Sequence, residues 1–401
     1  MKKKFQFLII AWIILLSGAV AFSHYYNLAF YSLFGFIIIY LRYAKISLVK
    51  FRVVTWPVLV LSTLIIFTLF INTDFSVTLS YLHLILKIIL ASIIPVVIPF
   101  KNFKEIYLKF VYVLSITSLL IYFIVLLYPG TLLFFPEITS GGGASYYNLG
   151  LAVYKIPLNN LLRNGSVFWE AGAFQVIINL AIALELTFHQ FKHKKRLFFF
   201  IATIISTFST TGYIILAIQF LFFILYSKKN LKKGNRLMPK LIIFSSIIIF
   251  LFSSLFIDRV IGKFSDTNSS FLIRTISLLT DIEIFNKAPL LGVGLSNYKI
   301  LVREIAFNNF NLDLGSSMNS ITYYLAQYGI IFVLVLFFYY LKSSSILSNK
   351  SVVLKWFYFS VFIMLFSTAN FFTSFLFLTF MFYGIVDKIK PKDCSNLRTH
   401  Y

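Results

Sequence analysis

Cysteine and acidic residues are scarce in this chain. Its 401 residues include one cysteine, Cys394, and 13 Asp and Glu against 36 Lys and Arg. A single cysteine excludes an internal disulfide framework and a cysteine-based metal site within one chain. Only 12% of the residues are charged, which excludes an ordinary soluble domain, whereas 59% are hydrophobic and 19% aromatic. This is the composition of an integral membrane protein.

Apolar runs recur along the whole chain. A helix needs about 20 apolar residues to cross a hydrocarbon core of roughly 30 Å. We therefore expect an all-α integral membrane protein, a single polytopic domain over residues 1–401 with about twelve transmembrane helices. The expected spans are residues 6–22, 25–41, 53–71, 76–99, 106–128, 168–190, 197–208, 212–226, 240–257, 320–341, 353–369 and 371–386. The two short runs, 197–208 and 212–226, form either two spans joined by a tight turn or a re-entrant hairpin.

The basic residues are unevenly distributed. A formal net charge of +23 would suit a nucleic-acid-binding protein. When the N-terminus is placed in the cytoplasm and the spans alternate, however, most basic residues fall in loops on that side, such as 193–196 and 228–233. This is the positive-inside pattern of a multi-pass protein with cytoplasmic N- and C-termini, and membrane lipid is a further partner for these loops. We expect no nucleic-acid partner.

Two long segments interrupt the apolar chain. The first outer loop covers 129–169, and a second, larger outer loop covers 258–319 between the ninth and tenth spans. Both exceed the usual connection of roughly 4–6 residues, and long loops in compact proteins tend to be functional or disordered. Their apolar content favours order. Leu272, Ile276 and Leu279 have helical spacing, which predicts a helix on the membrane surface or docked on the bundle.

Charged residues flank the start of the sixth predicted span. Arg163 precedes the span and Glu170 lies near its first turn, with Ser166 as the expected N-cap. One interpretation is a functional site. The other is an ion pair at the membrane boundary with Trp169 as an interfacial anchor.

Arg274 and Arg303 bracket a glycine turn in the second outer loop. Gly292 and Gly294 follow Pro289, which indicates a sharp turn where backbone comes close to another group. No third glycine follows at the spacing of a dinucleotide-binding motif. The turn is therefore either part of a site or an ordinary loop turn.

No metal site and no cofactor are expected. The carboxylates of Asp281 and Glu283 offer oxygen ligands, but a solvated loop edge is the preferred interpretation. The five histidines are scattered over both sides of the membrane and one span: His24, His83, His189, His193 and His400.

Four stretches of the chain together carry a resemblance to a known family. They are Arg163–Phe174, with Arg, Gly and Glu at a span entrance; Thr207–Gly212, a turn rich in Thr and Ser; Arg274–Tyr298, with Pro-x-x-Gly-x-Gly-x-x-x-Tyr; and Asn319–Gly329, with Asn ahead of an apolar stretch and Gly-Ile. In this order, over roughly residues 160–335, and within the twelve-span layout, they resemble the O-antigen polymerase and ligase superfamily, the Wzy-type proteins.

The resemblance implies a membrane glycosyltransferase without a cofactor. Such a polymerase joins undecaprenyl-pyrophosphate-linked oligosaccharide repeat units into a surface polysaccharide (O-antigen, capsule or exopolysaccharide) on the outer face of the bacterial cytoplasmic membrane. A flippase and a chain-length regulator of the same pathway are the implied protein partners. Arg163 and Arg274 would stabilise the departing pyrophosphate, and Glu170 would act as general base or orient an arginine. The implied substrate-binding residues are Arg303, Tyr298, Asn319, Gly292 and Gly294, with packing or loop capping as the alternative for Tyr298 and Asn319.

Two positions depart from the family pattern. Met318 stands where many relatives, especially the ligases, have His, and Thr210 follows Ser209 where the pattern has Arg. Met318 favours a polymerase over a ligase, because it cannot act as a base. A flippase or transporter of lipid-linked sugars is a third interpretation, but it predicts more ionisable residues deep in the spans than Lys87 and Glu185.

Overall fold

The computed structural model of the chain describes residues 2–44, 47–140, 143–156, 162–189, 191–227, 270–315, 319–348 and 351–386. The helices in chain order are α1 (Lys2–Leu16), α2 (Val20–His24), α3 (Tyr26–Leu41), α4 (Leu48–Ile71), α5 (Thr78–Val97), α6 (Phe100–Leu127), α7 (Ala171–His189), α8 (Lys194–Thr207), α9 (Thr210–Ser227), α12 (Ser270–Lys287), α13 (Leu295–Phe310), α14 (Ser320–Leu347), α15 (Val352–Thr368) and α16 (Phe375–Val386). The short elements are the 3-10 helices η1 (Phe75–Val77) and η2 (Pro129–Phe134) and the strands β1 (Glu137–Thr139), β2 (Ser145–Asn148) and β3 (Val153–Lys155).

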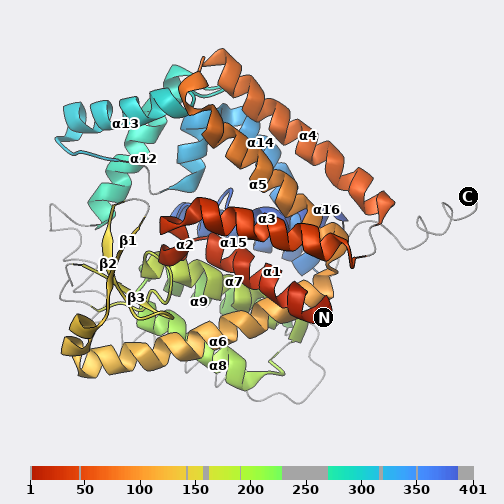
Figure 1. The fold of residues 1–401 in the computed structure, drawn as a ribbon, viewed down its shortest axis with the longest axis vertical. Helices are drawn as coiled ribbons and strands as arrows, with labels where there is room; N and C mark the ends of the chain where they lie inside the picture. The colour runs from red at the N-terminus through yellow and green to blue at the C-terminus, as the bar shows by residue number, and fades with distance from the viewer. Residues whose placement is uncertain are drawn as a thin grey trace, which may run out of the picture.

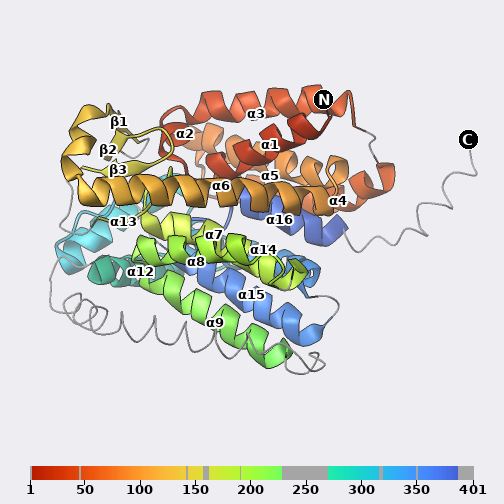
Figure 2. The same cartoon turned by 90° about the horizontal axis from the view of Figure 1, so that it is seen from below.

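Most long helices run side by side between two ends of one bundle (Figure 2). The strands and α13 lie at one end, and α1 begins at the other. Figure 1 also shows α4 and α5 as a neighbouring pair at the edge of the bundle, next to α14 and α16. The strands of residues 129–169 and α13 of residues 258–319 therefore lie at the same end of the bundle.

Among the described residues, five helical segments are long and apolar enough to cross a membrane: Leu48–Ile71, Phe75–Val97, Phe100–Leu127, Ala171–His189 and Ser320–Leu347. Shorter apolar helices include Tyr26–Leu41, Val352–Thr368 and Phe375–Val386. Large apolar side chains on α4, such as Leu59 and Phe67, point outward and are exposed, which suits a lipid environment. These helices support the prediction of an all-α membrane protein. The number of spans stays a prediction, and the ninth predicted span, 240–257, lies outside the described residues.

The first predicted span, 6–22, is wrong in one respect, because the helix breaks at Gly18. This residue has φ +149°, and a Cβ atom there would lie 2.0 Å from the Trp169 ring. The amide of Val20 donates a hydrogen bond to the carbonyl of Val167 at 2.9 Å. The end of α1 is thus joined to the segment that leads into α7.

The segment predicted as the first outer loop contains an antiparallel sheet, which was not among the predicted elements. Its strand order is β1-β2-β3, with Tyr146 opposite Ile138 and Lys155. Tyr146 and Val153 are buried together with Val20 of α2. The strands are three or four residues long, too short for a clear alternating pattern.

The helix predicted around Leu272, Ile276 and Leu279 exists as α12, but its buried face is different. Ile276 and Asp281 are buried, whereas Leu272 and Leu279 are 36% and 47% exposed. The inward face includes the fully buried Ser277. An outward apolar stripe and an inward polar face are the arrangement of a helix that contacts lipid.

Candidate functional site

The segment before α7 is held against the C-terminal end of α8. Asn164 is fully buried and donates a hydrogen bond to Ser206 Oγ at 2.9 Å. Arg163 Nε donates to the carbonyl of Thr207, the last residue of α8, at 3.0 Å. Carbonyls at a helix C-terminus lack intrahelical partners and favour cations. The first two of the four stretches that carry the resemblance are therefore in direct contact.

Glu170, and not Ser166, occupies the start of α7. The expected N-cap is wrong, because Ser166 Oγ donates instead to the carbonyl of Leu151 at 3.4 Å. The backbone carbonyl of Glu170 accepts a hydrogen bond from the amide of Ala173 at 3.1 Å. The Glu170 carboxylate thus lies near the positive end of the helix dipole.

Glu170 and Arg274 lie next to Gly172, and the charges of both act on Arg163. A Cβ atom added to Gly172 would lie 3.0 Å from Glu170 Oε1 and 3.7 Å from Arg274 Nη2. The missing side chain lets a carboxylate from the start of α7 and a guanidinium from α12 approach the same backbone. Burial lowers the pKa of Arg163, the charge of Glu170 raises it, and the charge of Arg274 lowers it. We call Arg163, Glu170 and Arg274 the charged cluster.

The charged cluster is not a set of closed ion pairs. Within the described residues, neither arginine forms an ion pair with Glu170. Arg274 Nε is buried without a hydrogen-bond partner in the same part of the chain. Buried donors nearly always have a partner, so this nitrogen marks a position for a ligand or water. The interpretation of an ion pair at the membrane boundary does not describe this site.

Trp169 is half-buried and packs against other parts of the protein. Its ring fills the space beside Gly18 and stacks on Phe371 with 5.6 Å between the ring centroids. It therefore joins the end of α1 and the segment before α16 to the start of α7.

Two tyrosines border the charged cluster. Burial raises the pKa of Tyr146 on β2, and the charge of Glu170 raises it further. Tyr213, in the first turn of α9, raises the pKa of Arg163 through its charge. Its hydroxyl donates a hydrogen bond to the carbonyl of Ile205 at 2.7 Å. The chain contains 24 tyrosines, so only the fold could single out these two.

Replacing Gly172 by Ala tests the geometry of the charged cluster. The added methyl group displaces the Glu170 carboxylate by a few tenths of an ångström, and we expect any reaction at this site to slow by about tenfold. Alanine also stabilises a helix by about 1 kcal/mol relative to glycine. We therefore expect the reaction to slow while the protein stays folded. Turnover and thermal unfolding of the purified variant measure the two effects separately.

Gly35→Ala is the matched control, because Gly35 lies inside α3 with open space where the methyl group would go. It should raise the melting temperature and leave turnover unchanged. Equal turnover in Gly172→Ala and in the unsubstituted protein would contradict a site at this position.

The Gly292–Gly294 turn packs against the protein itself. Both glycines have positive φ, +72° and +80°. A Cβ atom on Gly292 would lie 2.3 Å from the carbonyl carbon of Gln327, and one on Gly294 would lie 2.3 Å from Asp74 Oδ2. The buried Asp74 carboxylate also accepts a hydrogen bond from the amide of Leu295 at 2.6 Å, so it caps the N-terminus of α13. The backbone of this turn comes close to another group, as predicted, and that group belongs to the protein itself.

The same turn fills a break in α14. Gly329, inside α14, has φ +76°. The amide of Ile330 donates to the carbonyl of Pro289 at 2.9 Å, and the amide of Val293 donates to the carbonyl of Ala326 at 3.0 Å. Backbone groups freed by the break are satisfied by the turn. The third and fourth stretches of the resemblance therefore pair with each other.

Tyr298 points into the protein interior. It is 1% exposed, and its hydroxyl donates to Asp281 Oδ1 at 2.8 Å. The hydroxyl of Thr322 donates to Asp281 Oδ2 at 2.6 Å. The interpretation of Asp281 as part of a solvated loop edge is wrong, because this carboxylate is fully buried between α12, α13 and α14.

Arg303 lies on α13, and Asn319 lies at the start of α14. The Arg303 side chain is 69% exposed, and its Nε lies 3.9 Å from Asp313 Oδ1. The side chain of Asn319 caps α14 by accepting a hydrogen bond from the amide of Ile321 at 3.0 Å. Met318 lies outside the described residues.

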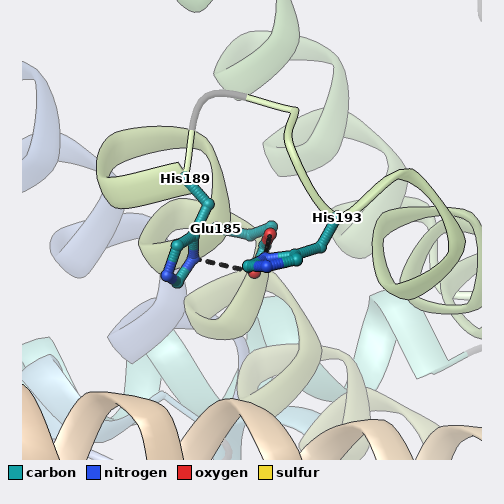
Figure 3. Close-up of side chains that lie close together, drawn as sticks. All are labelled: Glu185, His189 and His193. Atoms are coloured by element: carbon teal, nitrogen blue, oxygen red, sulfur yellow. Dashed lines mark hydrogen bonds and ion pairs between the residues drawn. The ribbon is translucent and has the colours of Figure 1, made fainter.

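A second group of charged and titratable side chains lies at the opposite end of α7 (Figure 3). Glu185, His189 and His193 each direct one ligand atom to a common point, and these atoms lie within 4.8 Å of one another. The expectation of scattered histidines is wrong for His189 and His193. Glu185, His189 and His193 follow one another at intervals of four residues, which was a signal for a cluster in the sequence.

Comparison with known proteins gives no relative: no protein-family model matches the chain, and no curated protein matches it. The class of protein therefore rests on the fold and the site. Apolar helices of spanning length and outward apolar side chains define a helical membrane protein. Arg163 and Glu170 lie close to Arg274, which is more than 100 residues away in the sequence.

Proposed function

We propose that this protein is a polysaccharide polymerase that joins undecaprenyl-pyrophosphate-linked repeat units. The observation that carries the proposal is the charged cluster, in which two arginines and a carboxylate lie close together with no ion pair among them in the described part of the chain. Such a group suits a reaction in which a pyrophosphate leaves and a hydroxyl loses its proton.

The proposed reaction forms one bond and breaks one bond at the same carbon. A hydroxyl of the incoming repeat unit attacks the anomeric carbon at the reducing end of the growing glycan. The bond from that carbon to the pyrophosphate oxygen breaks, and undecaprenyl pyrophosphate leaves. The hydroxyl proton passes to Glu170, and the arginines stabilise the charge that develops on the pyrophosphate.

Arg274 is assigned the main contact with the leaving group. Its unpartnered Nε and its Nη2 belong to one planar guanidinium, which can bind two phosphate oxygens at once. Arg163 is fixed by Thr207 and supplies a second positive charge. Glu170 has the alternative role of holding an arginine in place, since its carboxylate lies beside the same backbone as Arg274 Nη2.

The remaining predicted site residues receive supporting roles. Gly292, Gly294, Tyr298 and Asn319 fix the turn, α13 and α14, as their contacts with protein groups indicate. Arg303 is exposed, so a contact with the hydrated glycan is the role left for it.

The proposed setting is the bacterial cytoplasmic membrane, with about twelve spans and both termini in the cytoplasm. In this orientation the charged cluster faces the outer side, where lipid-linked repeat units are joined. Membrane lipid, a flippase and a chain-length regulator are the proposed partners.

Reconstitution in proteoliposomes tests the function. Lipids from a host that lacks the gene supply the unpolymerised lipid-linked repeat units. We expect the purified protein to convert them into a ladder of polymers and to release undecaprenyl pyrophosphate. Transfer of finished glycan to another acceptor without a ladder would show a ligase, and movement of units across the bilayer without bond formation would show a flippase.

Arg163→Ala is expected to slow ladder formation by about 10²-fold, because it removes one of the two positive charges that stabilise the leaving group. The rate of lipid pyrophosphate release measures this effect. Arg52→Ala is the control, since Arg52 is an exposed arginine near the start of α4. A normal rate in Arg163→Ala would remove this residue from the mechanism.

A further inference from the structure

The group at the far end of α7 is separate from the charged cluster. The helix has 19 residues, which places its two ends about 28 Å apart at 1.5 Å per residue. Glu185 is fully buried in the last turns of α7, and the His193 side chain is 50% exposed. A buried carboxylate and a half-exposed imidazole therefore lie side by side at this end of α7 (Figure 3).

The turn from α7 into α8 places His193 opposite Glu185. Phe191 has a left-handed backbone, φ 66°, and the amide of Lys192 donates to the carbonyl of His189 at 2.9 Å. The chain reverses here, so that His193 Nδ1 lies 3.0 Å from Glu185 Oε1 and His189 Nδ1 lies 3.2 Å from Glu185 Oε2. Two imidazole nitrogens thus face one carboxylate.

A guanidinium nitrogen marks a cation position at this point. Arg196 Nη2 lies 2.5 Å from Glu185 Oε2, 2.7 Å from His193 Nδ1 and 3.3 Å from His189 Nδ1. This nitrogen carries two N–H groups but faces three atoms that can accept. A metal ion with three or four coordination positions can bind all three of these atoms, whereas the guanidinium nitrogen has N–H groups for only two of them.

The outer contact of His189 favours the tautomer that binds metals. His189 Nε2 lies 3.1 Å from Glu105 Oε1 on α6. A neutral imidazole that donates its Nε2–H to this carboxylate presents the lone pair of Nδ1 to Glu185 and Arg196. A carboxylate behind a histidine is the usual second layer of a metal site, where it fixes the ring and strengthens the ligand.

We propose that Glu185, His189 and His193 bind a divalent transition-metal ion of the Zn²⁺ class. Two imidazole nitrogens and one carboxylate oxygen are a ligand set for Zn²⁺, with water in the fourth position. Imidazole ligands disfavour Ca²⁺ and Mg²⁺, which prefer oxygen. The incoming ion displaces Arg196 toward solvent and ties the end of α7 to the start of α8. This site does not depend on the polymerase function.

Metal titration of the full-length protein tests the proposal. The protein is purified in detergent with an affinity tag free of histidine, treated with a chelator and dialysed. We expect one Co²⁺ per chain to bind with the visible absorption of a four-coordinate site, and Zn²⁺ to displace it. We also expect bound Zn²⁺ to raise the melting temperature, because the ion binds the folded state. Absence of a stoichiometric Co²⁺ spectrum would overturn the proposal.

Four variants separate a metal site from an ion-pair network. His193→Ala should weaken Zn²⁺ binding by about 100-fold or more, and Glu105→Gln by about 10-fold to 100-fold. Arg196→Ala should strengthen it by at least about tenfold, since a competing cation is removed. His24→Ala, at an exposed histidine outside the site, should bind as the unsubstituted protein does. His193 is half exposed, so its variant remains folded even where a change at the buried Glu185 does not. Weaker binding in Arg196→Ala, or unchanged binding in His193→Ala, would show that the guanidinium is the native cation here.

Discussion

Arg274→Lys is expected to abolish long polymer while the protein remains folded and inserted. Lysine keeps the positive charge but replaces a planar fork with a point charge, so the two-oxygen contact with pyrophosphate is lost. Arg274 Nε has no protein partner in the described residues, so the exchange removes no hydrogen bond of this atom. We expect the rate of lipid pyrophosphate release to fall by about 10²-fold to 10³-fold. Gel analysis of the glycan should show single repeat units without a ladder.

Arg52→Lys is the matched control for this exchange. Arg52 is an exposed arginine at the membrane-surface end of α4, and the same substitution there should leave both rate and ladder unchanged. A full ladder from Arg274→Lys would show that charge alone suffices. A full ladder from both Arg274→Lys and Arg274→Ala would refute the proposed role of this arginine.

Gly292→Ala is expected to destabilise the protein strongly. Alanine at φ +72° costs roughly 1–2 kcal/mol. The new Cβ atom also lies 2.3 Å from the backbone of Gln327 in α14, and backbone cannot move aside as a side chain can. We expect a total loss of about 3 kcal/mol or more in the free energy of unfolding. Thermal unfolding in detergent should show a large decrease in melting temperature.

Gly150→Ala separates the two contributions. Gly150 has a similar φ of +78°, but nothing lies within 4 Å of the added atom. Its variant should show only the backbone cost, about 1–2 kcal/mol. A Gly292→Ala protein as stable as Gly150→Ala, with weakened substrate binding, would instead support the substrate-contact role predicted from the sequence.

The residues of the charged cluster could be predicted from the sequence because charged residues are scarce in it. Acidic and basic residues are few among apolar ones, and an isolated charge at a span boundary needs a physical reason. Arg163, Glu170 and Arg274 were therefore found by residue type and position. Arg303 satisfied the same criterion and yet lies exposed next to Asp313, because charge in a loop does not reveal which way the loop folds.

Contacts between residues that are distant in the sequence could not be predicted from it. Positive φ at Gly294 follows from the turn pattern, but its neighbour Asp74 is 221 residues from the Leu295 amide that it caps. The buried pair of Tyr298 and Asp281 was hidden for the same reason.

The sequence alone determined that this is a helical membrane protein, because burial of about 20 apolar residues in each span requires backbone groups to be satisfied within helices. It also determined the few chemically active side chains. Only the tertiary structure decided which of them meet. Packing of α7 against α8, and of α12 beside Gly172, unites Arg163, Glu170 and Arg274. The reversal after α7 unites Glu185, His189 and His193. Both outcomes depend on contacts between helices, which the periodicity of a single chain does not encode.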